Sequence, residues 1–215
     1  MSTRATAIAI LLLAAVAAVV IAWAGTTGVA LTTANAEKEE TSFGDLATDA
    51  LCAAAGTSIA LMPAVSFKSG TIPPGEVTLA GVTELLTQPT EGWSVVRLTG
   101  AQLLKTLERS VSRAPLPNAG FLQVSGLTVT YDPTGDRTGR VLSVLVGGTP
   151  LNPEGTYEVA MPQSLAKGGS GYLQIFGEQN IVRSGDDQLA QLIVSYVMAQ
   201  GTVNYSGQGR IIASR

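Results

Sequence analysis

The stretch at residues 161–176, MPQSLAKGGSGYLQIF, holds the residues of this chain best suited to binding a charged ligand. Lys167 is followed by Gly168, Gly169, Ser170 and Gly171, and successive backbone N–H groups in such a loop can form a nest for an anion. The spacing fits neither the phosphate-binding loop G-x-x-x-x-G-K-[ST] nor the dinucleotide fingerprint. A turn whose glycines permit positive φ explains the same pattern. The sequence therefore leaves two interpretations open, an anion site and a structural turn.

The sequence of 215 residues contains no histidine. This absence excludes Ser-His-Asp and Cys-His nucleophilic sites and every metal site with a histidine ligand. Catalysis by this chain alone would depend on carboxylates, Lys, Tyr or Ser. The single cysteine, Cys52, lies in the apolar stretch DALCAAAG and is predicted to be a small buried side chain. We therefore predict no catalytic residue, no metal ion and no cofactor.

The charged residues are few, and the formal net charge is −3. A nucleic-acid-binding protein needs a clustered basic face, so no nucleic-acid partner is predicted. The acidic residues at 37–40 are expected to be solvated, and Asp186 with Asp187 is expected to cap a helix. Glu108 and Arg109 are expected on the polar surface of a long helix.

The N-terminus carries the clearest targeting signal. Residues 5–24 are apolar except for Thr6, and Arg4 is the single charged residue before Glu37. About 20 helical residues span roughly 30 Å, enough to cross a bilayer, and this length favours a retained anchor. Alanine richness and the small-x-small pattern at 34–36 favour a cleaved signal peptide instead. In both cases the rest of the chain lies outside the cytoplasm, anchored to the membrane or secreted or periplasmic. The predicted division is an anchor or signal peptide plus linker at 1–36 and a domain at 37–215.

Apolar periodicity and turn residues predict the elements that position the glycine loop. Ser42, Thr78 and Thr99 are the expected N-terminal caps, and Gly56 and Gly201 the expected ends, of helices. The predicted helices cover 42–56, 79–86, 99–112 and 187–199. The predicted strands cover 58–62, 93–98, 122–125, 127–131, 141–146, 157–161 and 209–214. Because helices and strands are interspersed without strict βαβ alternation, we predict a single mixed α+β domain after one N-terminal hydrophobic helix.

Several stretches together resemble the C-terminal domain of the 5′-nucleotidase family. They are TSFGDLATDALCAAAGTSIAL, VVRLTGAQLLKTLERSVS, GFLQVSGLTVTYDP, GRVLSVLVGGTPLNPEGTYEVA and LAKGGSGY, in the family's order and spacing across residues 40–210. In that family this domain normally follows a metallophosphoesterase domain, which holds two metal ions through His, Asp and Asn ligands and hydrolyses the phosphate. The resemblance therefore implies the fold of the substrate-binding domain without the catalytic domain.

The resemblance also assigns positions for nucleotide binding, and several of them have changed. The family's Asn-x-Gly-Gly-Ile-Arg stretch is replaced by residues 63–68, in which Lys68 keeps the charge without the bidentate fork of Arg. The first stacking Phe has no aromatic counterpart in residues 87–92. Ser164 stands at the position of the second stacking Phe, and Ser170 at that of the ribose-binding Asp. Lys167, Gly168, Gly169, Gly171 and Tyr172 complete the predicted degenerate site.

Two lost base stacks, at about 1–3 kcal/mol each, and one charged hydrogen bond, at about 1.5–3, sum to roughly 4–9 kcal/mol. At about 1.4 kcal/mol per decade, a micromolar site becomes millimolar or weaker. The leading interpretation is thus an exported, non-catalytic module or accessory subunit of a membrane complex. The alternative is the specificity half of a split nucleotidase, with a separate metallophosphoesterase chain as partner. A third possibility is a new small-molecule pocket built on Trp93 and Tyr172.

Overall fold

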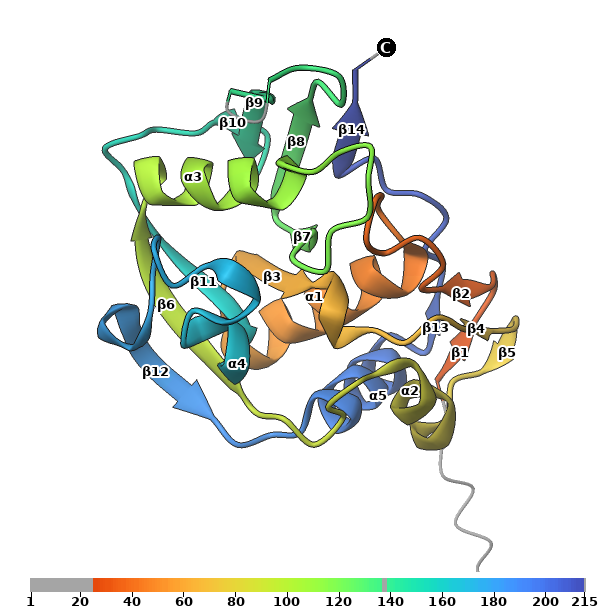
Figure 1. The fold of residues 1–215 in the computed structure, drawn as a ribbon. Helices are drawn as coiled ribbons and strands as arrows, with labels where there is room; N and C mark the ends of the chain where they lie inside the picture. Colours follow the sequence, from red (N-terminus) through yellow and green to blue (C-terminus); the bar gives the residue numbers. More distant parts are fainter. Residues whose placement is uncertain (1–24, 137–138, 215) are drawn as a thin grey trace, which may run out of the picture.

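The centre of the fold is a five-stranded sheet in the order β12-β6-β11-β3-β7 (Figure 1). A computed structural model describes residues 25–136 and 139–214. The strands of this sheet are β3 (Ile59–Pro63), β6 (Trp93–Thr99), β7 (Leu122–Ser125), β11 (Thr156–Pro162) and β12 (Ile181–Gly185). β11 runs parallel to β3 and antiparallel to β6, so strands distant in sequence meet at the middle of the domain.

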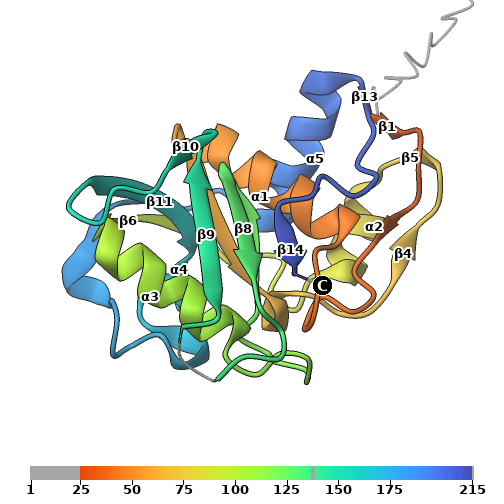
Figure 2. The ribbon, with the colours of Figure 1, turned by 90° about the horizontal axis from the view of Figure 1, so that it is seen from above.

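The central sheet is covered on both faces. Ala60, Met62 and Val95 pack with the helices α1 (Ser42–Ala55), α2 (Leu79–Leu85) and α5 (Leu189–Gln200). Ile59, Leu61 and Val96 point the other way, into a second apolar cluster with α3 (Gly100–Val111) and the short helix α4 (Gln163–Ala166). Successive strand residues point to opposite faces, so burial on both faces explains the continuous apolar runs. Figures 1 and 2 show α2 and α5 grouped near α1, away from α3.

A second sheet, in the order β10-β9-β8-β14, lies on the α3 side (Figure 2). Its strands are β8 (Leu127–Tyr131), β9 (Val141–Val146), β10 (Thr149–Pro150) and β14 (Ile211–Ala213). The remaining strands form two small sheets: β1 (Thr26–Thr27) between β5 (Gly75–Glu76) and β13 (Thr202–Val203), and β2 (Leu31–Thr32) with β4 (Thr71–Ile72). Helices and sheets together make the mixed α+β domain that the sequence predicts, which confirms the fold class.

The helix ends follow the predicted capping chemistry with two corrections. Thr78 and Thr99 cap α2 and α3, and Thr99 forms a reciprocal capping box with Gln102. α1 is capped by Thr41 rather than the predicted Ser42, whose hydroxyl instead accepts the Thr32 N–H at 2.8 Å. The Asp186–Asp187 pair does not cap α5, because Gln188 occupies the cap position without a side-chain bond.

Residues 25–36, expected to form a linker, are part of the folded structure. β1 pairs with β5 and β13, β2 pairs with β4, and Leu31 is fully buried. Short backbone ladders therefore hold this segment against the domain. The predicted N-terminal hydrophobic helix falls on residues 1–24, outside the described residues. Within residues 25–136 and 139–214, no helix has the length and apolar character to cross a membrane.

Candidate functional site

One edge of the central sheet gathers the segments that the resemblance assigns to ligand binding. β3 ends at Pro63, which pairs with Leu122 at the start of β7. β11 ends at Pro162, which pairs with Trp93 at the start of β6. Because these four residues mark the same edge, the chain segments next to them leave the sheet together. We call this edge the site edge.

Hydrogen bonds connect the segments that leave the site edge. The bonds run from the Val65 N–H to the Ala119 carbonyl at 2.9 Å, from the Thr87 N–H to the Ser66 carbonyl at 2.9 Å, from the Gln163 N–H to the Gly92 carbonyl at 3.1 Å, and from the Ser164 N–H to Glu91 Oε1 at 2.5 Å. The structure thus brings residues 64–68, 87–92 and 163–172 to neighbouring places around one edge. The sequence order alone does not reveal this adjacency.

The glycine loop adopts backbone conformations that favour glycine. Gly168 and Gly171 have φ values of 87° and 85°, and Ser170 lies between them at 57°. A Cβ atom at Gly171 would lie 2.5 Å from Arg109 Nη2, and one at Gly168 would lie 2.7 Å from the Leu173 Cα. Left-handed backbone and close packing therefore account for both glycines without a ligand.

Tyr172, at the end of this loop, is a core residue. Its ring is fully buried and stacks on Phe176 with 5.6 Å between ring centroids. Its hydroxyl donates to the Gly120 carbonyl at 2.6 Å, and burial raises the pKa of this phenol. Trp93 packs in the cluster on the opposite face of the sheet. The suggested pocket built on Trp93 and Tyr172 is therefore wrong.

Two charged residues of α3 have structural partners rather than the expected solvent-exposed role. The Arg109 guanidinium donates to the Ser170 carbonyl at 3.1 Å and lies 5.7 Å from the centre of the Tyr172 ring. Glu108 accepts the backbone N–H groups of Arg140 and Val141, both at 3.0 Å. Both side chains connect α3 to loops that sequence spacing places far away.

The polar residues of the predicted site lie on the surface around the site edge. Lys68, Ser164 and Lys167 are exposed, and Ser170 is half-buried. A cavity of about 530 Å³ opens beside the 3-10 turn Ala64–Ser66. It is lined by Thr33, Asn35, Ala36, Glu37, Lys38, Ala64, Val65, Phe67, Ser69 and Thr87, and by none of the eight predicted residues. The sequence does not predict this cavity, because Thr33, Asn35 and Ala36 of its lining lie in the segment expected to be a linker.

The Cys52 thiol and the carboxylates remain as candidates for chemistry. Burial raises the pKa of the half-buried Cys52 thiol, which makes it a weak nucleophile. Within the described part of the chain, no group of His, Cys, Asp or Glu side chains is arranged to hold a metal ion.

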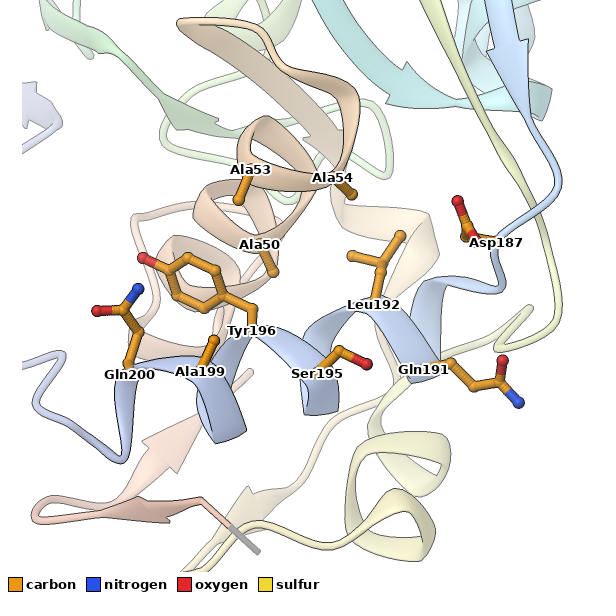
Figure 3. A pocket seen from close by; sticks show the side chains of 10 residues that line it. All are labelled: Ala50, Ala53, Ala54, Asp187, Gln191, Leu192, Ser195, Tyr196, Ala199 and Gln200. Atoms are coloured by element: carbon orange, nitrogen blue, oxygen red, sulfur yellow. The ribbon is translucent and has the colours of Figure 1, made fainter. Parts of the chain in front are cut away.

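A groove of about 420 Å³ lies between α1 and α5, apart from the eight predicted residues (Figure 3). Ala50, Ala53 and Ala54 of α1 face Leu192 and Tyr196 of α5 across it. Small residues at helical spacing on α1 open this space between the two helices.

Comparison with known proteins decides the family. Residues 20–178 match the family described as 5′-nucleotidase, C-terminal domain. The chain belongs to this family. The family predicted from the sequence motifs is thereby confirmed, and the match covers nearly three-quarters of the chain.

Relatives of this 5′-nucleotidase C-terminal domain are larger proteins. The snake venom 5′-nucleotidase of Naja atra is 33% identical over 149 residues, covering 65% of this chain and 28% of that protein. The 5′-nucleotidase of Mus musculus is 31% identical over 127 residues, covering 55% and 22%. The crystal structure of a 5′-nucleotidase precursor from Thermus thermophilus superposes with a TM-score of 0.80 at 30% identity, covering 88% of this chain and 39% of that one. The chain thus spans about a quarter of the length of these curated relatives.

Proposed function

We propose that this chain is an exported, non-catalytic member of the 5′-nucleotidase C-terminal domain family that acts as a binding or structural module, or as an accessory subunit, at a membrane. The relatives are named 5′-nucleotidases, and this chain spans about a quarter of their length. The 215 residues contain no histidine, so they offer no histidine ligand for a metal ion.

The observation that carries this proposal is the packing of the glycine loop and Tyr172. Inside the core, the Tyr172 ring stacks on Phe176 and its hydroxyl donates to the Gly120 carbonyl, so neither is available to a ligand. Arg109 holds the loop through the Ser170 carbonyl. The loop therefore has a structural reason to exist, while Ser164 offers no aromatic ring to stack on a base.

The location outside the cytoplasm is supported by two observations. Residues 5–24 form an apolar run behind Arg4, as in an anchor or an export signal. Several relatives carry snake venom in their names.

A split nucleotidase is the second candidate. Lys68 and Lys167 remain exposed near the site edge, where they can attract an anionic substrate, and the half-buried Ser170 lies in the same loop as Lys167. In this arrangement a separate metallophosphoesterase chain would supply the metal ions and this chain would select the substrate.

The first experiment is gentle purification of the native protein from membranes in mild detergent, followed by intact mass spectrometry of every chain that co-purifies. A stoichiometric partner and retention of residues 1–36 support the anchored accessory subunit. A metallophosphoesterase chain in the same complex, with phosphatase activity that depends on added divalent metal, supports the split enzyme. Metal-dependent phosphatase activity of the purified chain alone contradicts both.

A further inference from the structure

A cluster of charged residues holds the C-terminal end of the domain. Glu40, which precedes α1, accepts three backbone N–H groups from the C-terminal segment. They belong to Gln208 at 2.7 Å, Arg210 at 2.5 Å and Ile211 at 2.9 Å. One carboxylate therefore fixes the backbone that leads into β14. We call Glu40, Asp45, Asp49 and Arg210 the C-terminal clamp.

Within this clamp, Asp49 and Arg210 form a fully bonded ion pair. Two parallel bonds join the Arg210 guanidinium to the two Asp49 oxygens, both at 2.8 Å. Asp49 also accepts from the Ser125 hydroxyl at 2.6 Å and from the Tyr205 hydroxyl at 2.8 Å. These contacts satisfy the charges of both partners.

Asp45 is different. Its side chain is fully buried, and neither carboxyl oxygen accepts a hydrogen bond. Among the described residues, its cationic neighbour is Arg210, whose Nε lies 3.6 Å away and whose guanidinium is already bonded to Asp49. One guanidinium thus faces three carboxyl groups in this clamp, and a buried carboxylate without hydrogen bonds is costly.

Protonation of Asp45 removes this cost. Burial raises the pKa of Asp45 to about 8; Arg210 opposes the rise, while Glu40 and Asp49 add to it. The other titratable groups around the clamp are Tyr205, whose hydroxyl binds Asp49, Tyr196 next to it, and Cys52 on α1. Tyr205 and Cys52 have raised pKa values, so they remain neutral in the range where Asp45 titrates.

The segment held by the clamp has little other secondary structure. β14 has three residues and pairs on one side with β8, in parallel. Ile211 closes a small apolar space with Leu107, Val111 and Val129. Without the clamp, this short strand would be the main attachment of the segment, and its separation would expose the edge of β8.

We propose that Asp45 makes the attachment of residues 208–213 proton-dependent: the clamp is closed with a neutral Asp45, and ionisation of Asp45 favours an open form in which β14 leaves β8. The closed form binds one more proton than the open form. Opening therefore becomes more favourable as pH rises from the ordinary aspartate range near 4 to about 8, by up to tenfold per pH unit, and is constant above that. Asp45 stays on α1 in the open form and regains only part of its hydration, so its pKa there lies above the ordinary aspartate value and the rise in opening covers fewer pH units.

Hydrogen exchange of the full chain tests the proposal. The exchange of a peptide covering residues 207–215 is measured between pH 5 and pH 9 for wild type, Asp45→Asn and the control Asp132→Asn. The ratio of rates between variants cancels intrinsic exchange, because the peptide is identical in all three. We expect the exchange rate of wild type, divided by that of Asp45→Asn, to rise roughly ten- to a thousandfold between pH 5 and pH 8 and to stay constant above pH 8. Asp132→Asn is expected to behave like wild type.

Two results would overturn the proposal. One is the same pH slope in Asp45→Asn and wild type. The other is an equal loss of protection in β6 and β11, because the proton would then act on the whole domain instead of the C-terminal segment. If Asp45→Asn does not fold, carboxyl-carbon NMR of wild type decides: titration of Asp45 below about pH 5 contradicts the clamp, and titration near pH 8 supports it.

Discussion

Replacing Tyr172 by Phe tests whether this residue serves the fold. The substitution removes one hydroxyl and leaves the ring, its stacking on Phe176 and the Arg109 contact in place. The hydroxyl donates to the Gly120 carbonyl at 2.6 Å in a fully buried position. The variant therefore loses a hydrogen bond and leaves a buried carbonyl unpaired, which costs about 1–3 kcal/mol. For a domain of this size, that corresponds to a fall in Tm of roughly 2–12 °C.

The assay is urea denaturation followed by far-UV circular dichroism at neutral pH. Tyr157→Phe is the matched control, because the Tyr157 hydroxyl accepts the Asn152 N–H at 3.1 Å in an exposed position. Water replaces that bond, so the control is expected to lose less than about 0.5 kcal/mol. Equal stability changes in the two variants would refute the assignment of Tyr172 to the core. Loss of small-molecule binding without loss of stability would instead make Tyr172 a ligand residue.

Three further substitutions test the contacts around the site edge and the clamp. Gly168→Ala is expected to cost about 1 kcal/mol more stability in urea denaturation than the control Gly148→Ala. Both glycines have φ above 80°, but an added methyl group meets the Leu173 backbone only at Gly168, so equal costs would show that the loop adjusts freely. Glu108→Gln is expected to lower the free energy of unfolding by about 1.5–3 kcal/mol, because the carboxylate accepts two backbone N–H groups. The control Glu154→Gln, at an exposed position, should change it little, and equal values would show that the Glu108 contact does not stabilise the fold. Burial alone would raise the pKa of Asp49, but hydrogen bonds from Arg210, Ser125 and Tyr205 lower it below 3.8. Ionised Asp49 therefore stabilises the fold, and wild type should lose this contribution as the pH falls through the pKa of the folded state. Asp49→Asn should be less stable near pH 7 but should show a flatter loss between about pH 5 and pH 3; an unchanged acid profile would contradict the ion pair.

The sequence was most informative where local chemistry decides the structure. Thr99 with Gln102 and the left-handed Gly56 define helix ends through contacts within a few residues. Apolar runs such as residues 59–63 predict buried strands, because both faces of the central sheet are covered. The family also follows from the sequence, since its motifs survive in order.

Features that depend on distant partners were missed. Strands of two residues, such as β1 and β13, are too short to show an apolar period. Each is stabilised by its backbone pairing with the other. Glu108 resembles a surface residue until the loop at Arg140 folds over it. The clamp had a visible signal, Asp45 and Asp49 four residues apart in an apolar helix, but its cation comes from Arg210, 161 residues after Asp49. Likewise, the predicted site residues share one edge only because β3 and β11 are parallel neighbours.

The position of β11 between β6 and β3 sets an order for folding during synthesis. β3 can pair with β7, and β6 can form with α3, but β11 alone joins these two halves. About 100 residues separate Pro63 from Pro162, so at roughly 5–20 residues per second several seconds pass before the sheet can close. During that interval the edges of β3 and β6 that later pair with β11 have no partner and can pair with other strands. The nascent chain is therefore most vulnerable to aggregation before residue 162 emerges.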